Sequence, residues 1–192
     1  SAASDVYKRQ GLRTMLERFR GGWAAAMTPP ARLLIALRIH PDVVTWVGTI
    51  ATAIIAIGCF SQGWLWQGAL LVTVFIFSDG LDGQMARMLD ASSPWGAFLD
   101  SSLDRIGDGA LFGGIVLFYA GLGDSVLWAG MALAALVLGQ VTSYVKARGE
   151  SLSMTVKGGL AARADRILVL LVGALLTGLA RSHHIPRVLE WS

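Results

Sequence analysis

The chain of 192 residues carries a net charge of +3, and 54% of its residues are hydrophobic while only 15% are charged. Because soluble domains contain about 25% charged residues, this composition excludes an ordinary soluble protein and indicates one polytopic membrane domain. The single cysteine, Cys59, excludes an intrachain disulfide and a metal site built on cysteines.

The N-terminal part of the chain is basic and precedes all the long apolar segments. Residues 1–10 fit no membrane pattern and are interpreted as a remnant of processing or expression. In residues 11–38, one helical face carries apolar side chains and the opposite face carries arginines, which predicts a juxtamembrane amphipathic helix. The apolar positions are Leu12, Met15, Leu16 and Phe19. Beside membrane spans, this basic segment suits an anionic lipid surface better than nucleic acid, and no nucleic acid partner is expected.

Five apolar segments follow, each close to the roughly 20 residues that a membrane-spanning helix needs. The first opens with Pro41, which suits a first helical turn. The predicted spans cover residues 43–60, 64–85, 95–119, 125–145 and 167–180. The sequence therefore predicts an all-α membrane helix bundle over residues 39–182. Residues 183–192 are interpreted as a tail or the start of a truncated sixth span.

Lysine and arginine are distributed unevenly over the predicted loops. The turns at 61–63 and 121–124 carry none, whereas the N-terminal segment, Arg87 and residues 146–166 carry nearly all of them. Positive charges mark the cytoplasmic side of a membrane protein. The sequence therefore predicts a multi-pass protein of the cell (inner or plasma) membrane, with the N-terminus and the polar site facing the cytoplasm.

Four aspartates interrupt the apolar pattern between residues 78 and 104. Asp79 and Asp82 are three residues apart, and Asp100 and Asp104 are four apart, so each pair shares a helical face. A short loop joins the two helices, which places both pairs at the same end of the bundle. Converging carboxylates repel one another unless protons or cations neutralise them. Oxygen ligands alone suit Mg²⁺ or Mn²⁺, and two such ions would clamp a diphosphate.

Glycines and an arginine accompany these carboxylates. Gly80, Gly83 and Gly96 lie on or beside the carboxylate faces, where glycine serves either the approach of a ligand or close helix packing. Arg87 lies one turn from Gly83 and would either meet a phosphate or anchor the cytoplasmic end of its helix.

Two further aspartates lie near the four. Asp90 falls in the predicted loop, where a cap or loop charge is expected. Asp108 continues the stripe formed by residues 96, 100 and 104, and it is expected to have a structural role through a pair with Arg105 or with a neighbouring helix.

The same stretch resembles the signature of the CDP-alcohol phosphotransferase family, with every fixed position of the motif filled. The motif reads Asp79-x2-Asp82-Gly83-x2-Ala86-Arg87-x8-Gly96-x3-Asp100-x3-Asp104. The similarity extends from about Pro41 to about Leu170. Within the family, the segments PDVVTWVGT, SLDRIGDGA and QVTSYVKARGE are most similar to actinobacterial phosphatidylinositol phosphate synthases.

The resemblance implies a six-helix homodimer that transfers a phosphatidyl group from CDP-diacylglycerol to an alcohol and releases CMP. Asp104 would be the general base as well as a metal ligand. The ligands implied for two Mg²⁺ or Mn²⁺ ions are Asp79, Asp82, Asp100 and Asp104. The residues implied for CDP-diacylglycerol are Asp42, Thr45, Gly83, Ala86, Arg87 and Gly96.

Cations near the ends of the fourth and fifth spans indicate a phosphorylated acceptor, although positive-inside topology also explains them. Resemblance to the inositol phosphate synthases implies inositol 1-phosphate. The residues expected to bind its phosphate are Ser143, Lys146, Arg148, Arg163 and Arg166. Two alternatives are the same chemistry with glycerol 3-phosphate and a divalent cation channel or transporter. Against the channel, no acidic residue continues past Asp108 through the rest of the third span.

Overall fold

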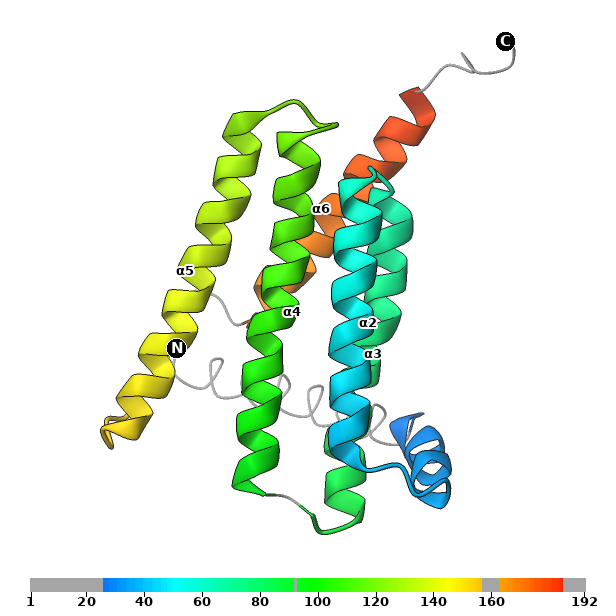
Figure 1. Ribbon diagram of the computed structural model, residues 1–192, viewed down its shortest axis with the longest axis vertical. Coiled ribbons are helices and arrows are strands. Elements are labelled where there is room, and N and C mark those ends of the chain that lie inside the picture. The colour runs from blue at the N-terminus through cyan, green and yellow to red at the C-terminus, as the bar shows by residue number, and fades with distance from the viewer. Residues whose placement is uncertain (1–25, 92, 157–162, 185–192) are drawn as a thin grey trace, which may run out of the picture.

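The structure is a computed structural model that describes residues 26–91, 93–156 and 163–184, without the side chains of residues 77–79 and 183–184. The described residues form long helices joined by turns (Figure 1). The long helices are α2 (Pro41–Ser61), α3 (Leu65–Met88), α4 (Pro94–Ala120), α5 (Val126–Ser151) and α6 (Arg163–His184). The all-α prediction is confirmed.

Each helix follows the apolar segment that predicted it, and the ends are set by local chemistry. Pro41 opens α2 and Pro94 opens α4, where a missing backbone N–H costs nothing. The Ser93 hydroxyl caps α4 by accepting a hydrogen bond from the Gly96 N–H at 3.0 Å. Helix α5 runs to Ser151, beyond the predicted end at residue 145, because its polar last turns remain helical outside the apolar segment.

The predicted amphipathic helix over residues 11–38 lies largely outside the described residues. Residues 26–36 are helical, and the side chain of Gln84 on α3 donates a hydrogen bond to the Thr28 hydroxyl at 3.3 Å. This contact ties the described part of the juxtamembrane segment to the same end of α3 that carries the aspartate motif.

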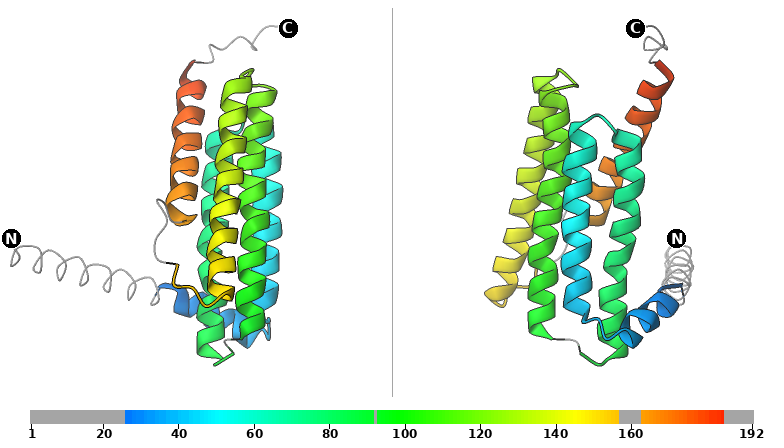
Figure 2. Two further views of the ribbon diagram at one scale, coloured as in Figure 1. Left: turned by 90° about the vertical axis from the view of Figure 1, so that its left-hand side faces the viewer. Right: turned by 45° about the vertical axis from the view of Figure 1, so that its right-hand side comes forward.

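Helix α2 lies at the centre of the bundle. It packs against α3 and α4, while α5 packs on α4 and α6 packs on α3 (Figures 1 and 2). The contact between α2 and α4 is close because Gly114 faces the backbone of α2. A Cβ atom at Gly114 would lie 2.5 Å from the Ala56 carbonyl oxygen, so only glycine fits there. This packing brings α3 and α4 to opposite sides of α2 and positions their aspartates.

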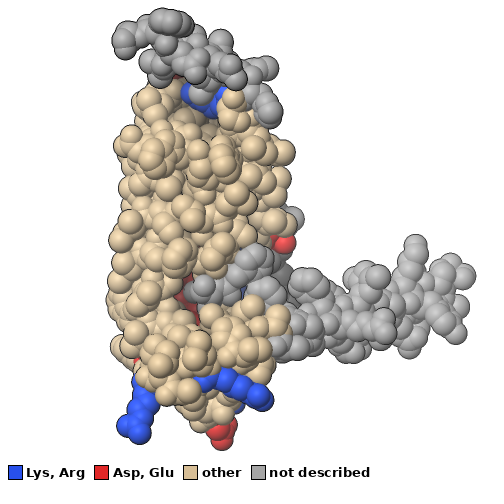
Figure 3. Space-filling view, turned by 90° about the vertical axis from the view of Figure 1, so that its right-hand side faces the viewer, with Lys and Arg blue, Asp and Glu red and all other residues tan. Residues whose placement is uncertain are grey.

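The outer surface of the bundle is rich in exposed apolar side chains, and charge gathers mainly towards one end in the view of Figure 3. Exposed examples are Ile54, Val74, Phe98, Leu138 and Val169. By length and composition, α2, α3 and α5 are each able to cross a membrane. Helix α4 carries Asp104, Arg105 and Asp108 near its middle, which lowers its apolar character. Apolar surface of this extent indicates a protein that faces lipid.

Candidate functional site

Residues of three helices meet around Asp82, whose side chain is buried on α3. The Asp82 carboxylate accepts hydrogen bonds from the Thr45 hydroxyl of α2 and from the Gly83 N–H. Asp42 on α2 and Asp100 on α4 lie close enough to repel its negative charge. The structure therefore brings together four residues that the sequence analysis singled out separately, from α2, α3 and α4.

Asp104 lies one turn after Asp100 on α4, and an arginine of α6 holds it. Arg163 Nη1 lies 2.8 Å from Asp104 Oδ1, and Arg163 Nε donates a hydrogen bond to Asp108 Oδ1 at 3.0 Å. On the same helix, Arg105 Nη2 lies 3.5 Å from Asp108 Oδ2 and 3.9 Å from Asp104 Oδ2. The expected pairing of Asp108 with Arg105 and with a neighbouring helix is confirmed in both parts.

The chemistry of these side chains fits a hard divalent cation. The donors are carboxylates, and the repulsion that Asp42 and Asp100 exert on Asp82 is the kind that a bound cation relieves. Among the side chains that the structure describes, no three or more acidic, histidine or cysteine residues are gathered closely enough to hold a metal ion. The Asp79 side chain lies outside that description, and Asp104 is turned to Arg163.

Gly83 and Gly96 lie on the same helices as the carboxylates Asp82 and Asp100. A Cβ atom at Gly83 would lie 3.7 Å from Arg87 Nη2, and one at Gly96 would lie 3.5 Å from Ser93 Oγ, which are ordinary contacts. Among the described residues, neither glycine is required by a close contact between helices. Arg87 donates a hydrogen bond from Nε to the Gly83 carbonyl oxygen at 3.2 Å. Ala86 is half-buried beside them.

Asp90 lies outside this group. It occupies the turn between α3 and α4, with a φ of 52° in the left-handed region, which aspartate tolerates better than most residues. The prediction that Asp90 is a loop residue is confirmed.

The expected acceptor residues lie on the C-terminal half of α5 and on the first turn of α6, where Arg163 is turned to Asp104 and Asp108 of α4. Arg166 reaches from α6 to α5, where its Nε would lie 3.3 Å from a Cβ atom at Gly139. The Ser143 hydroxyl, one turn further along α5, donates to the Gly139 carbonyl oxygen at 3.1 Å. Ser143 and Arg166 therefore both lie beside Gly139.

Lys146 and Arg148 are exposed on the last turns of α5. Lys146 Nζ lies 4.0 Å from Glu150 Oε1, and both side chains are more than half exposed. Exposed ion pairs contribute at most about 1 kcal/mol, so an anionic ligand exchanges easily for Glu150.

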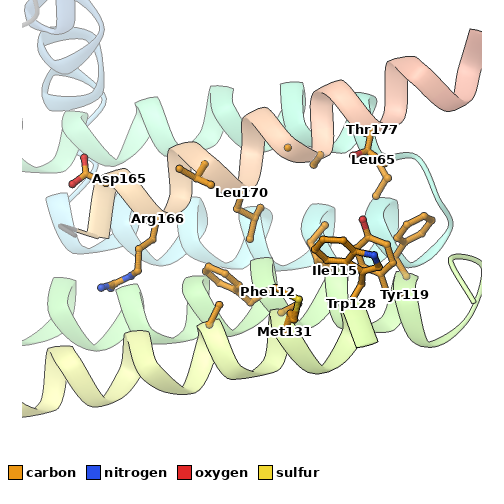
Figure 4. Close-up of a pocket in the computed structure, with 16 residues that line it drawn as sticks. Leu65, Phe112, Ile115, Tyr119, Trp128, Met131, Asp165, Arg166, Leu170 and Thr177 are labelled. Atoms are coloured by element: carbon orange, nitrogen blue, oxygen red, sulfur yellow. The ribbon is translucent and has the colours of Figure 1, made fainter. Parts of the chain in front are cut away.

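An apolar cleft of about 480 Å³ lies on one side of α6, between that helix, α4 and α5. In Figure 4, Arg166 lies at one end of this cleft and the aromatic rings of Tyr119 and Trp128 lie at the other. A second apolar cleft, of about 500 Å³, lies between α3 and α6 and has Arg163 in its lining. Each first-turn arginine of α6 therefore adjoins a cleft suited to hydrocarbon.

Comparison with known proteins identifies the family. A family model for CDP-alcohol phosphatidyltransferase matches residues 38–191. The chain belongs to the CDP-alcohol phosphatidyltransferase family. It is 59% identical over 172 residues to a phosphatidylinositol phosphate synthase of Cutibacterium acnes, covering 90% of this chain and 83% of that protein. A second, from Streptomyces avermitilis, is 44% identical over 169 residues, with 87% of this chain and 69% of that protein covered.

Solved structures of this family share the fold. The crystal structure of Mycobacterium tuberculosis phosphatidylinositol phosphate synthase with CDP-DAG bound matches with a TM-score of 0.77 and 39% identity, over 79% of this chain and 76% of that one. The same enzyme in complex with manganese and citrate matches with a TM-score of 0.75 and 38% identity, over 83% and 75% of the two chains. As a member of the family, the present chain is a transferase of phospholipid biosynthesis that uses a divalent metal.

Two contacts of the site differ from those expected from the sequence, in which Thr45 and Arg163 had other partners. The expected partner of Thr45 was the nucleotide and that of Arg163 was the acceptor phosphate, whereas the structure joins Thr45 to Asp82 and Arg163 to Asp104 and Asp108. The available signal was that a buried carboxylate requires a cation or a donor. Which residue supplies that cation or donor depends on how the helices are rotated against one another.

Proposed function

We propose that the protein transfers the phosphatidyl group of CDP-diacylglycerol to inositol 1-phosphate, forming phosphatidylinositol phosphate and releasing CMP. The observation that carries this proposal is that the motif carboxylates Asp82 of α3 and Asp100 of α4 lie near enough for their charges to interact. Support comes from the relatives named phosphatidylinositol phosphate synthase and from the related structure with CDP-DAG bound.

Two divalent ions, Mg²⁺ or Mn²⁺, are the proposed cofactors. Their proposed ligands are Asp79, Asp82, Asp100 and Asp104. When bound, the ions supply positive charge to the diphosphate and to the departing CMP. The related structure with manganese and citrate supports the use of a divalent metal.

Asp104 is the proposed general base. A hydroxyl oxygen of the acceptor attacks the phosphorus that carries diacylglycerol, and the bond from that phosphorus to the bridging oxygen breaks. CMP leaves with the bridging oxygen, and Asp104 takes the proton of the attacking hydroxyl. The Asp104 side chain is 19% exposed, which leaves it accessible to an acceptor. Its position one turn beyond Asp100 places it beside the diphosphate site.

The donor is proposed to lie along α2, α3 and the start of α4. Gly83, Ala86 and Gly96 provide the open backbone against which the cytidine rests, and Arg87 meets a phosphate. Asp42 and Thr45 complete this set near the nucleotide, since both surround Asp82. The two apolar clefts that flank α6 are suited to the acyl chains.

The acceptor phosphate is proposed to bind at the C-terminal half of α5 and the first turn of α6. The residues are Ser143, Lys146, Arg148, Arg163 and Arg166. Arg166 and Ser143 converge on Gly139, which supports a common site. Arg163 is proposed to serve the acceptor from its place beside Asp104, so that base and phosphate are bound close together.

The proposed assembly is a homodimer in the cell (inner or plasma) membrane, with the active site facing the cytoplasm. Five spans lie within residues 39–182, and the family resemblance leads us to expect a sixth. Helix α5 exposes Val126 at 87% and Leu138 at 66%, apolar surface that is suited to lipid or to a second copy.

Release of CMP by the purified protein in nanodiscs tests the proposal. The reaction contains CDP-diacylglycerol, Mg²⁺ and one of three acceptors: inositol 1-phosphate, glycerol 3-phosphate or inositol. We expect release with inositol 1-phosphate alone, and its loss in Asp82→Asn. Release with glycerol 3-phosphate instead would overturn the acceptor, and metal-independent release would overturn the mechanism.

A further inference from the structure

Arg163 bridges two carboxylates of α4 with two different nitrogens. Nη1 lies 2.8 Å from Asp104 Oδ1, and Nε lies 3.0 Å from Asp108 Oδ1. Between these two positions stands Gly107, where a Cβ atom would lie 3.9 Å from Arg163 Nη2, so the guanidinium lies along an unobstructed stretch of α4. Because each carboxylate has its own nitrogen, Arg163 is able to leave Asp104 and keep its bond to Asp108.

The two ion pairs differ in their access to water. The Asp108 side chain is 7% exposed, whereas the Asp104 side chain is 19% exposed. A buried carboxylate left without a cation is strongly destabilising, so Asp108 is the anchor that Arg163 keeps. Asp104 is the more accessible end of the bridge, where a cation arriving from water competes with Arg163.

The charges of the cluster support this division. Two anions, Asp104 and Asp108, stand beside two cations, Arg105 and Arg163. Asp108 lies against both arginines, at 3.0 Å from Arg163 Nε and 3.5 Å from Arg105 Nη2, and neither contact involves Asp104. When a metal ion displaces Arg163 from Asp104, the Asp108 carboxylate therefore still neutralises the charge of the Arg163 guanidinium.

We propose that Arg163 competes with the divalent cations for the Asp104 carboxylate, and that Asp108 is a positioning residue which holds Arg163 when the metal takes Asp104. The inference rests on the proposed function, since that function makes Asp104 a metal ligand. In this role, which is separate from the proposed contact of Arg163 with the acceptor phosphate, Arg163 and Asp108 act by setting how much of Asp104 is available to the metal.

Binding of Mn²⁺ in the absence of both substrates tests this directly. Electron paramagnetic resonance of free Mn²⁺ gives the dissociation constant for the full chain in nanodiscs. We expect Arg163→Gln to bind Mn²⁺ about tenfold more tightly, because a charge-assisted bond to Asp104 no longer opposes the metal. The matched control is Arg181→Gln, the same change at the other end of α6, where the side chain lies over the Phe118 ring. Its affinity is expected to equal that of the wild type.

The Asp108→Asn variant changes the affinity in the opposite direction. Without its second anchor, Arg163 pairs more strongly with Asp104, so Mn²⁺ is expected to bind about threefold to tenfold more weakly. Loss of a nearby negative charge by itself also weakens the binding, and a double-mutant cycle separates the two causes. In the Arg163→Gln background, the effect of Asp108→Asn is expected to fall below about twofold.

Equal effects of Asp108→Asn in the two backgrounds would overturn the inference, as would an Arg163→Gln affinity equal to that of Arg181→Gln. If Arg163→Gln does not fold, as thermal unfolding would show, an unchanged affinity in Asp108→Asn overturns the inference instead. If the wild-type protein binds no Mn²⁺, or if Asp82→Asn leaves the Mn²⁺ binding unchanged, the proposed metal site itself is contradicted. That outcome is distinguishable from the others, because it is measured without any variant of Arg163 or Asp108.

Discussion

The two ends of the candidate site are built differently. Around Asp82, the Thr45 hydroxyl of α2 and the Asp82 carboxylate of α3 are both buried and are joined across the helices by a hydrogen bond. At the last turns of α5, Lys146 and Arg148 are exposed, and the pair with Glu150 is long. Preorganised buried charge suits a lipid donor that is held in one place during the reaction. Exposed cations suit an acceptor that arrives from water and leaves within the product.

The largest expected effect is on the buried side. Asp104→Asn keeps the shape of the side chain and removes its basicity, and we expect kcat to fall about 10²–10⁴-fold. CMP release at saturating donor and acceptor measures this. The control is Asp124→Asn, in the turn between α4 and α5, which is expected to leave kcat unchanged. A loss below about fivefold in Asp104→Asn would exclude this residue as the base.

A smaller effect is expected from Thr45→Val, which removes a hydrogen bond to buried Asp82 at nearly constant volume. An unpaired buried acceptor costs about 1–3 kcal/mol, so we expect a lower unfolding temperature. Because the Thr45 hydroxyl also fixes the orientation of the Asp82 carboxylate, its loss is expected to weaken Mn²⁺ binding about tenfold. Thr52→Val is the matched control, since Thr52 is also buried on α2. Equal effects of the two substitutions on Mn²⁺ binding would show that the contact between Thr45 and Asp82 has no part in the metal site.

The smallest effect is expected at the exposed end. Lys146→Gln is expected to raise the KM for inositol 1-phosphate about twofold to fivefold, because an exposed charge pair contributes at most about 1 kcal/mol. Glu150→Gln removes the competitor of the ligand and is expected to lower the same KM slightly. Steady-state kinetics at saturating CDP-diacylglycerol measures both. A fall in kcat of Lys146→Gln as large as the fall in Asp104→Asn would show that the two ends of the site do not differ in this way.

The helices and the faces of the site follow from local sequence, and the contacts between helices do not. Apolar runs predicted each described long helix, since helix formation and membrane burial both act over about 20 residues, but they missed polar end turns such as the last six residues of α5. Spacing predicted that Asp100, Asp104 and Asp108 share a face. The partners of Asp82 and Asp104 are Thr45 and Arg163, 37 and 59 residues away in the chain. These pairings depend on helix rotation and on close contacts such as the one at Gly114.

The division of the site into a donor end and an acceptor end is tested most directly by two-substrate kinetics of Arg166→Gln. Arg166 lies on Gly139 of α5 near Ser143 and at the end of an apolar cleft. The account predicts that the KM for inositol 1-phosphate rises about tenfold or more, since a charged hydrogen bond is lost, while the KM for CDP-diacylglycerol changes less than about twofold. A rise in the KM for CDP-diacylglycerol with the acceptor KM unchanged would contradict it.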